Sequence, residues 1–155
     1  GIRDAQESRG LGDVYKRQVP RNSHANMKST GVFTLNAISS NQIEDAHHTS
    51  AKYPDNISEF DQTNLEPEIK QGWEAPYVKG AQIQIGCSYV NEYLIKENDT
   101  VLVVGKIEHL FIEEQLLGKD GWIQLDKGDI VSINGLDGYA IPTLIKRFEY
   151  ARPKK

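Results

Sequence analysis

Residues 83–95 read IQIGCSYVNEYLI, and residues 100–114 read TVLVVGKIEHLFIEE. Both segments are rich in β-branched and aromatic residues, which favour strands. In the first segment the apolar side chains Ile83, Ile85 and Cys87 recur at every second position, the period of a strand with one buried face. The KEND sequence between the segments supplies residues that favour a turn. The two stretches therefore predict a long antiparallel hairpin, half buried along one face.

Shorter elements are expected on either side of this hairpin. Residues 22–29 are predicted to be a helix that Asn22 or Ser23 can cap, residues 42–48 a helix preceded by capping residues, and residues 32–38 a strand. Residues 49–80 hold three of the six prolines and isolated aromatic residues, which favours an ordered, functional loop. Pro142 is predicted to open a last helical turn. This pattern predicts a mainly β fold, a small Greek-key-like barrel with short helices.

Composition excludes several classes of protein. The chain has 155 residues, of which 38% are apolar and 26% charged, as expected for one globular domain. Its longest aliphatic run is far shorter than the ~20 residues that span a bilayer, so no membrane partner is expected. The net charge is −4 with scattered basic residues, so no nucleic acid partner is expected either. A lone cysteine, Cys87, excludes an internal disulfide framework and indicates a cytoplasmic protein.

The first 18 residues differ from the rest of the chain. GIRDAQESRGLGDVYKRQ shows neither helical nor strand periodicity and lacks the apolar stretch of a signal peptide. Its last eleven residues resemble the translation of library-adapter DNA at the end of a sequencing read. The alternative is a disordered native tail. We predict that residues 1–18 lie outside the fold and that residues 19–155 form one domain.

Five sequence blocks, in order, resemble the flavin reductase-like family. They are RNSHANM with GVFTLN (21–27 and 31–36), SAKYP with EF (50–54 and 59–60), APYV (75–78), DTVLVVGKI (99–107) and GLDGY (135–139). Spread along the chain in this order, they extend the resemblance over residues 19–153. The resemblance implies an FMN-binding split β-barrel of the flavoredoxin type. In that family, strands ahead of the first block carry part of the flavin site, so the resemblance also implies a truncated member missing its first strands.

The candidate binding residues begin at Arg21, Asn22 and Ser23, where the first helix starts. Free backbone amides, a hydroxyl and a guanidinium at one helix end make a phosphate cradle, although a capped helix beside a surface arginine is the alternative. The resemblance assigns this block, with Asn26, to FMN. It also implies that His48 and Ser50 lie near the flavin edge.

A metal site and a catalytic side chain are not expected. His47 and His48 are adjacent on a helix and therefore point about 100° apart, with no third ligand evident. Solvated or helix-capping histidines are the alternative at that position. No nucleophile–base order or carboxylate pair stands out, so the catalytic residues stay unknown.

The resemblance implies an FMN-dependent NAD(P)H:flavin oxidoreductase, in which NAD(P)H is the co-substrate and a hydride passes through bound FMN. Two alternatives stay open: a non-catalytic FMN-binding module for electron transfer, and an inactive fragment that binds no flavin. The resemblance further implies a homodimer.

Overall fold

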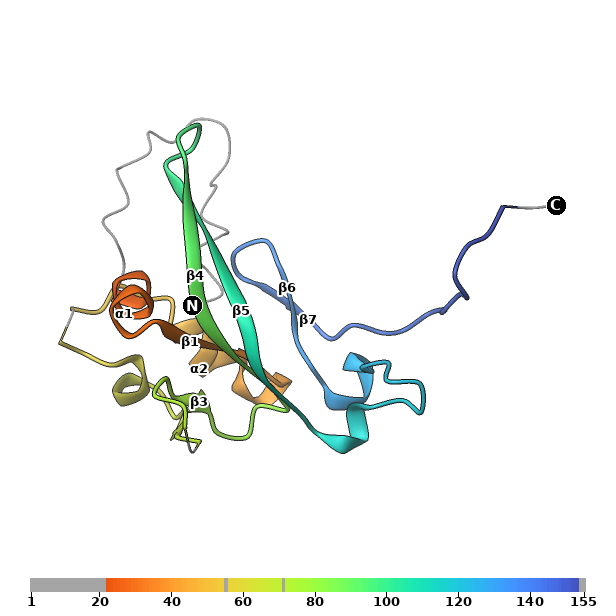
Figure 1. The fold of residues 1–155 in the computed structure, drawn as a ribbon. Helices are drawn as coiled ribbons and strands as arrows, with labels where there is room; N and C mark the ends of the chain where they lie inside the picture. The colour runs from red at the N-terminus through yellow and green to blue at the C-terminus, as the bar shows by residue number, and fades with distance from the viewer. Residues whose placement is uncertain (1–21, 55, 71, 154–155) are drawn as a thin grey trace.

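The long hairpin predicted from the sequence is the central feature of the computed structural model, which describes residues 22–54, 56–70 and 72–153 (Figure 1). Its strands are β4 (Ile83–Ile95) and β5 (Thr100–Ile112), paired antiparallel along their whole length. Asp99 takes a left-handed conformation, with φ 52°, at the end of the turn. The Asn98 side chain accepts hydrogen bonds from the Thr100 amide and hydroxyl. The turn is thus closed by the residue types that predicted it.

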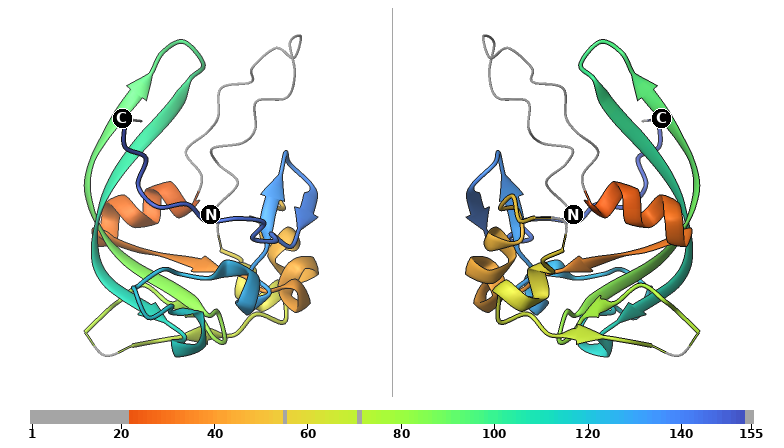
Figure 2. Two further views of the ribbon diagram at one scale, coloured as in Figure 1. Left: turned by 90° about the vertical axis from the view of Figure 1, so that its right-hand side faces the viewer. Right: turned by 90° about the vertical axis from the view of Figure 1, so that its left-hand side faces the viewer.

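The third strand of the sheet covers only part of this hairpin. Strand β1 (Val32–Ala37) pairs antiparallel with residues 83–88 of β4, giving the order β1-β4-β5. We call residues 83–89 and 105–112 the inner half and residues 90–104 the outer half. The inner half belongs to a three-stranded sheet, whereas the outer half is a two-stranded ribbon that projects from the body (Figures 1 and 2).

Burial falls along β4 from the inner to the outer half, while β5 is exposed in both halves, for example at Ile107 and Leu102, so the prediction of one buried face along the hairpin is wrong. Ile83 and Gln84 point to opposite faces, yet both are buried, while neighbours Tyr93 and Leu94 are both exposed. Cys87 in the inner half is 3% exposed, whereas Leu94 in the outer half is 62% exposed. The alternation of residue types predicted strand geometry, but burial depends on which other segments lie against each face.

Two helices flank the sheet as predicted, within one or two residues. Helix α1 (Asn22–Thr30) ends at Gly31, whose φ of 73° reverses the chain into β1. Helix α2 (Ile43–His48) follows a 3₁₀ turn at Ser40–Gln42. Because α1 is about 13 Å long and β1 runs back antiparallel to it, the start of α1 and helix α2 lie toward the same end of β1 (Figure 2).

The described part of the long loop, residues 49–54, 56–70 and 72–80, is ordered, as predicted, and side chains fasten it to the sheet. It contains a 3₁₀ turn at Glu59–Gln62 and a small two-stranded sheet, β2 (Pro67–Glu68) and β3 (Tyr77–Val78). Asn36 on β1 accepts a hydrogen bond from the Val78 amide at 3.1 Å. The buried Gln84 donates to the Val78 carbonyl at 2.7 Å and to Glu68 at 3.0 Å. These bonds hold the APYV block against β1 and β4.

The C-terminal part of the chain supplies the remaining core. Two 3₁₀ turns, at Glu114–Leu116 and Leu125–Gly128, precede the hairpin of β6 (Ser132–Asn134) and β7 (Gly138–Ala140). Leu116 and Ile130 pack with Ile83 in the main hydrophobic cluster.

The predicted last helical turn is wrong. Residues 141–153 leave the body as an extended arm without helix or strand (Figure 1). Pro142 permits a helix start but does not stabilise one. A helix this short needs an apolar face packed against the protein, and Ile145 is 95% exposed.

Candidate functional site

The start of α1 has the chemistry of an anion-binding end of a helix. Ser23 lies in its first turn with an exposed side chain, and the turn holds no acidic residue. The first backbone amides of any helix lack intrahelical partners, and the helix dipole is positive at this end. A hydroxyl beside such amides, with no carboxylate near it in the turn, suits a phosphate group.

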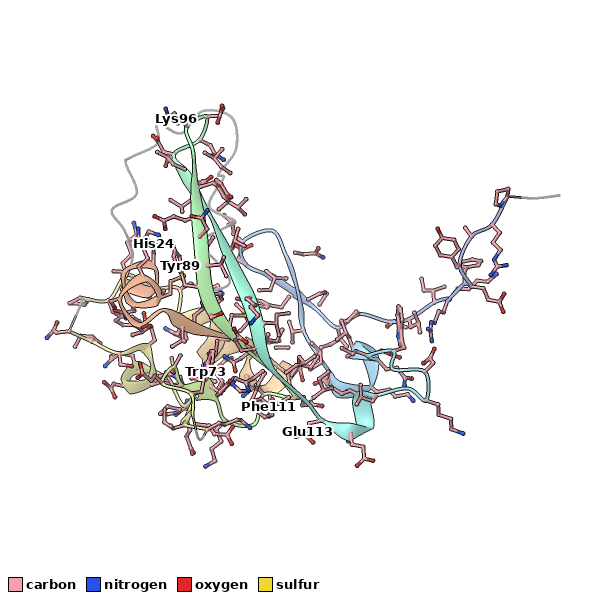
Figure 3. All side chains as sticks on the ribbon, viewed as in Figure 1. His24, Trp73, Tyr89, Lys96, Phe111 and Glu113 are labelled. Carbon is pink, nitrogen blue, oxygen red and sulfur yellow. The ribbon has the colours of Figure 1, made fainter. Side chains whose placement is uncertain are left out.

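Helix α1 is held in place by a charged cluster on β4. Glu92 accepts from Lys28 at 2.5 Å and contacts the His24 ring nitrogen at 2.6 Å. The hydrogen bond from Lys28, then those from His24 and Tyr89, lower the pKa of the Glu92 carboxyl from 4.5 to about 2. Figure 3 labels His24 on α1 and Tyr89 on β4. The cluster fixes the direction in which the start of α1 points.

The end of α2 meets the C-terminal hairpin through His47. Its Nδ1 lies 2.8 Å from the Tyr139 hydroxyl, and the two rings contact edge to face with centroids 5.8 Å apart. Ser50 donates to the His47 carbonyl at 2.6 Å. Tyr139 follows the turn at Gly135, which takes a left-handed conformation with φ 68°. His47, Ser50 and Tyr139 therefore form one connected group.

The predicted site residues fall into three groups: two at the edge of the described region, two further along α1 and two at the end of α2. Arg21 lies outside the described residues, and Asn22 is described only as the first residue of α1. Ser23 and Asn26 lie on α1 with exposed side chains, and the Asn26 carbonyl accepts from Ser29 and Thr30 at the helix end.

Ser50 lies with His47 at the end of α2, whereas His48 is exposed on another side of that helix. Tyr139 and His47 are contacts that sequence reasoning missed. The 100° step between neighbouring helical residues allows only one of two adjacent histidines to face a given partner. The sequence could not say which one, because the partner lies 92 residues away.

A layer of aromatic rings packs against the base of β5. His109 lies between Trp73 and Phe111, with ring centroids 4.8 and 6.1 Å away, and Tyr77 meets Phe111 edge to face at 5.7 Å. Lys70 lies over the Phe111 ring at 4.3 Å. Burial raises the pKa of the Tyr77 hydroxyl, which is fully buried and finds no hydrogen-bond partner among the described residues. Figure 3 places Trp73 and Phe111 at the base of the hairpin, so the layer supports the sheet.

Other kinds of site find little support in the described part of the chain. A shallow polar groove of about 420 Å³ lies beside Asp45, which binds the Asn64 amide and side chain, and beside the Lys79–Glu66 ion pair. Within residues 22–54, 56–70 and 72–153, no group of three or more potential ligand side chains is placed to hold a metal ion. No helix there has the length and apolar character needed to span a bilayer.

The fold is that of the split β-barrel class. A split-barrel protein assigned as a flavin reductase, from Shewanella frigidimarina, superposes with a TM-score of 0.79 at 34% identity, over 82% of this chain and 64% of that one. Component B of nitrilotriacetate monooxygenase from Bacillus cereus superposes with 0.73 at 22% identity, over 86% and 67%. Flavoredoxin from Desulfovibrio vulgaris gives 0.68 at 20%, over 82% and 67%.

The family follows from the sequence match. A model of the flavin reductase like domain matches residues 17–125, more than half of the chain, and the chain therefore belongs to this family. It spans about half the length of the two curated relatives it matches, 53% and 46%.

Proposed function

We propose that this protein is an FMN-dependent NAD(P)H:flavin oxidoreductase. The observation that carries the proposal is the start of α1, an acid-free helix end with an exposed hydroxyl in a chain of the flavin reductase-like family. Arg21, Asn22, Ser23 and Asn26 would hold the FMN phosphate. His48 and Ser50 would lie near the flavin edge, together with the group formed by His47 and Tyr139.

The chain's own residues act by binding and orientation. FMN, when bound, would supply the redox chemistry, a two-electron hydride transfer for which NAD(P)H is the donor and NAD(P)⁺ the product. The Glu92 cluster orients α1, so that the amides and the Ser23 hydroxyl present a fixed set of donors to the phosphate. The contact between His47 and Tyr139 joins α2 to the C-terminal hairpin and so holds the end of α2, where the flavin-edge residues lie, against that hairpin.

Titration with FMN followed by NADH and NADPH tests this function. The proposal predicts a flavin spectrum that stays with the protein through gel filtration and is bleached by a reduced nicotinamide under anaerobic conditions. Retained flavin without bleaching would instead indicate an electron-transfer module. No retained flavin would indicate that this chain is an inactive fragment.

Assembly and location form part of the same proposal. The exposed outer half of the hairpin and the family resemblance support a homodimer. The lone Cys87, 3% exposed, supports a reducing cytoplasm as its compartment. We further propose that residues 19–155 are one domain, part of a longer protein.

A further inference from the structure

Helix α1 has almost no apolar surface with which to pack. Its sequence, NSHANMKST, contains two apolar residues, of which Ala25 is exposed. Among residues 23–30, only His24 and Met27 are partly buried. A helix of nine residues is marginal by itself and needs contacts with the rest of the protein. The position of α1 therefore depends on a small number of specific contacts.

Ionic contacts join α1 to strand β4. His24 and Lys28 lie four residues apart and so face the same way from the helix. Both bind Glu92, His24 at 2.6 Å and Lys28 at 2.5 Å. The side chains of His24 and Glu92 are 21% and 25% exposed, so water and salt screen this pair less than a fully exposed one. The pair ties the first turn of α1 to the curved hairpin beside it (Figure 2).

The charge of His24 bears directly on an anion at this helix end. His24 follows Ser23 in the first turn, where the helix dipole is already positive. Histidine is the side chain that ordinarily gains or loses a proton between about pH 5 and 8. A protonated ring adds positive charge to the turn that holds the exposed Ser23, and it turns the hydrogen bond to Glu92 into an ion pair. Protonation of His24 therefore favours both the docking of α1 and its attraction for a phosphate.

The other titratable groups described at this contact keep one charge over that pH range. The hydrogen bond from Lys28 lowers the pKa of the Glu92 carboxyl to about 2, and the same bond raises the pKa of Lys28. Burial raises the pKa of the Tyr89 hydroxyl. Strand β1, which also lies beside α1, carries no titratable side chain in its sequence VFTLNA. Within the described part of the chain, His24 is therefore the group at this contact whose charge changes near neutral pH.

We propose that His24 and Glu92 regulate the phosphate site, which holds a phosphate ester more tightly when His24 is protonated. The inference rests on the proposed function and adds the regulation of that same site. Coupling between two binding events is reciprocal, so a phosphate bound at the start of α1 in turn favours the protonated form of His24. Binding of FMN is thus expected to take up protons near neutral pH, whereas binding of riboflavin, which lacks the phosphate, is not.

Titrations with FMN and riboflavin between about pH 6.5 and 8.5 test this coupling. Phosphate esters lose their second proton near pH ~6, so the ligand is mostly the dianion over this range. A charge at the end of a helix changes affinity by about two- to fivefold. We therefore expect FMN to bind about two- to fivefold more weakly at the upper pH, and riboflavin to bind equally at both.

Two histidine variants show whether the effect belongs to His24. His24→Gln removes the titrating group but keeps a side chain able to donate to Glu92, so FMN binding should no longer change with pH. The matched control, His109→Gln, removes a histidine from the aromatic layer and should keep the pH dependence of the original chain. An equal pH dependence in the original chain and in His24→Gln would overturn the proposal, as would its loss in both variants.

Calorimetry gives a measurement that needs no variant. Heats of FMN binding near pH ~7.5, where the phosphate is already a dianion, are measured in buffers of different ionisation enthalpy and give the number of protons taken up. Net uptake with FMN and none with riboflavin is expected. No uptake with either ligand would overturn the proposal.

A separate probe distinguishes failure of this regulation from failure of the proposed function. Hydrogen exchange of the α1 amides is measured with sulfate, a dianion over the whole pH range, and corrected for the intrinsic effect of pH on exchange. Sulfate should protect α1 more at the lower pH in the original chain, and equally at both in His24→Gln. That result with no flavin retained counts against the proposed function alone. Flavin retained without any dependence on His24 counts against the regulation alone, and a chain that shows neither effect overturns both.

Discussion

The inner and outer halves of the β4–β5 hairpin consist of the same two strands, yet β4 is covered mainly in the inner half, whereas β5 is largely exposed in both halves. β1, the long loop and the C-terminal turns lie against residues 83–89, and Ile83 and Cys87 there are buried. Beyond Tyr89 no described segment of β1 continues, and Leu94 and Leu102 are exposed. Strand pairing and β-propensity are thus enough to make the ribbon, while burial needs further segments or a second chain.

The largest effect is expected at the most covered apolar side chain. Leu116 is fully buried against Ile83 and Ile130. Leu116→Ala removes buried methyl groups and leaves a cavity, so it should lower the free energy of unfolding by about 2–5 kcal/mol. Urea denaturation followed by tryptophan fluorescence measures this. A loss below about 1 kcal/mol would show that the inner half does not depend on this cluster.

The boundary between the halves has its own close contact. A Cβ atom on Gly105 would lie 2.5 Å from the Phe33 ring. Gly105→Ala should therefore cost about 1–3 kcal/mol in unfolding free energy, because Phe33 must shift in a packed site. Adding Phe33→Leu to Gly105→Ala should recover part of the loss. If both variants are as stable as the original chain, Phe33 does not pack against β5.

A pH effect is expected where α1 meets the hairpin. The pKa of Glu92 is about 2 in the folded protein, against 4.5 for an unperturbed glutamate side chain such as that of the unfolded chain. Its carboxylate therefore stabilises the fold above pH 4.5. That contribution is lost as the pH falls from 4.5 toward 2. Glu92→Gln should therefore lower the unfolding free energy at neutral pH. Between neutral pH and about pH 3, the unfolding free energy of this variant should decrease less than that of the original chain. Glu97→Gln at the tip is the control, and equal curves for both variants would contradict the role of Glu92.

The smallest effect is expected in the outer half. Leu102→Ala alters an exposed side chain, so in dilute solution it should change the unfolding free energy by no more than about 0.5 kcal/mol. Fluorescence-detected denaturation at low protein concentration measures this. A loss as large as that of Leu116→Ala would mean that the outer half is packed within a single chain.

Local sequence signals predicted the elements well. The alternation in residues 83–95 and the KEND turn predicted the hairpin. Capping residues predicted the bounds of α1 and α2 to within one or two residues. The contacts between distant segments were not predictable. Asn36 binding Val78 and His47 meeting Tyr139 depend on how the loop and the C-terminal hairpin fold back. The prediction of a last helical turn was wrong because Pro142 indicates only where a helix can start. The packing that a short helix needs depends on distant residues.

The candidate site was predictable in part, for the same reason. A helix start rich in donors is a local feature, so the sequence placed Ser23 at the beginning of α1. Glu92 orients that helix by binding Lys28 and His24, which lie 64 and 68 residues earlier in the sequence. A contact between residues so far apart leaves no local signal in the sequence.

The most direct test of the central claim compares two ligands that differ in one phosphate. Arg21→Ala and Ser23→Ala are made in the longer parent protein of which we propose this chain is a part. Each hydrogen bond to a charged phosphate contributes roughly 1.5–3 kcal/mol, so Arg21→Ala should weaken FMN binding by about 10- to 150-fold. Ser23→Ala should cause a smaller loss, and riboflavin binding should barely change in either variant. Equal losses for FMN and riboflavin, or no loss for either, would contradict a phosphate site at the start of α1.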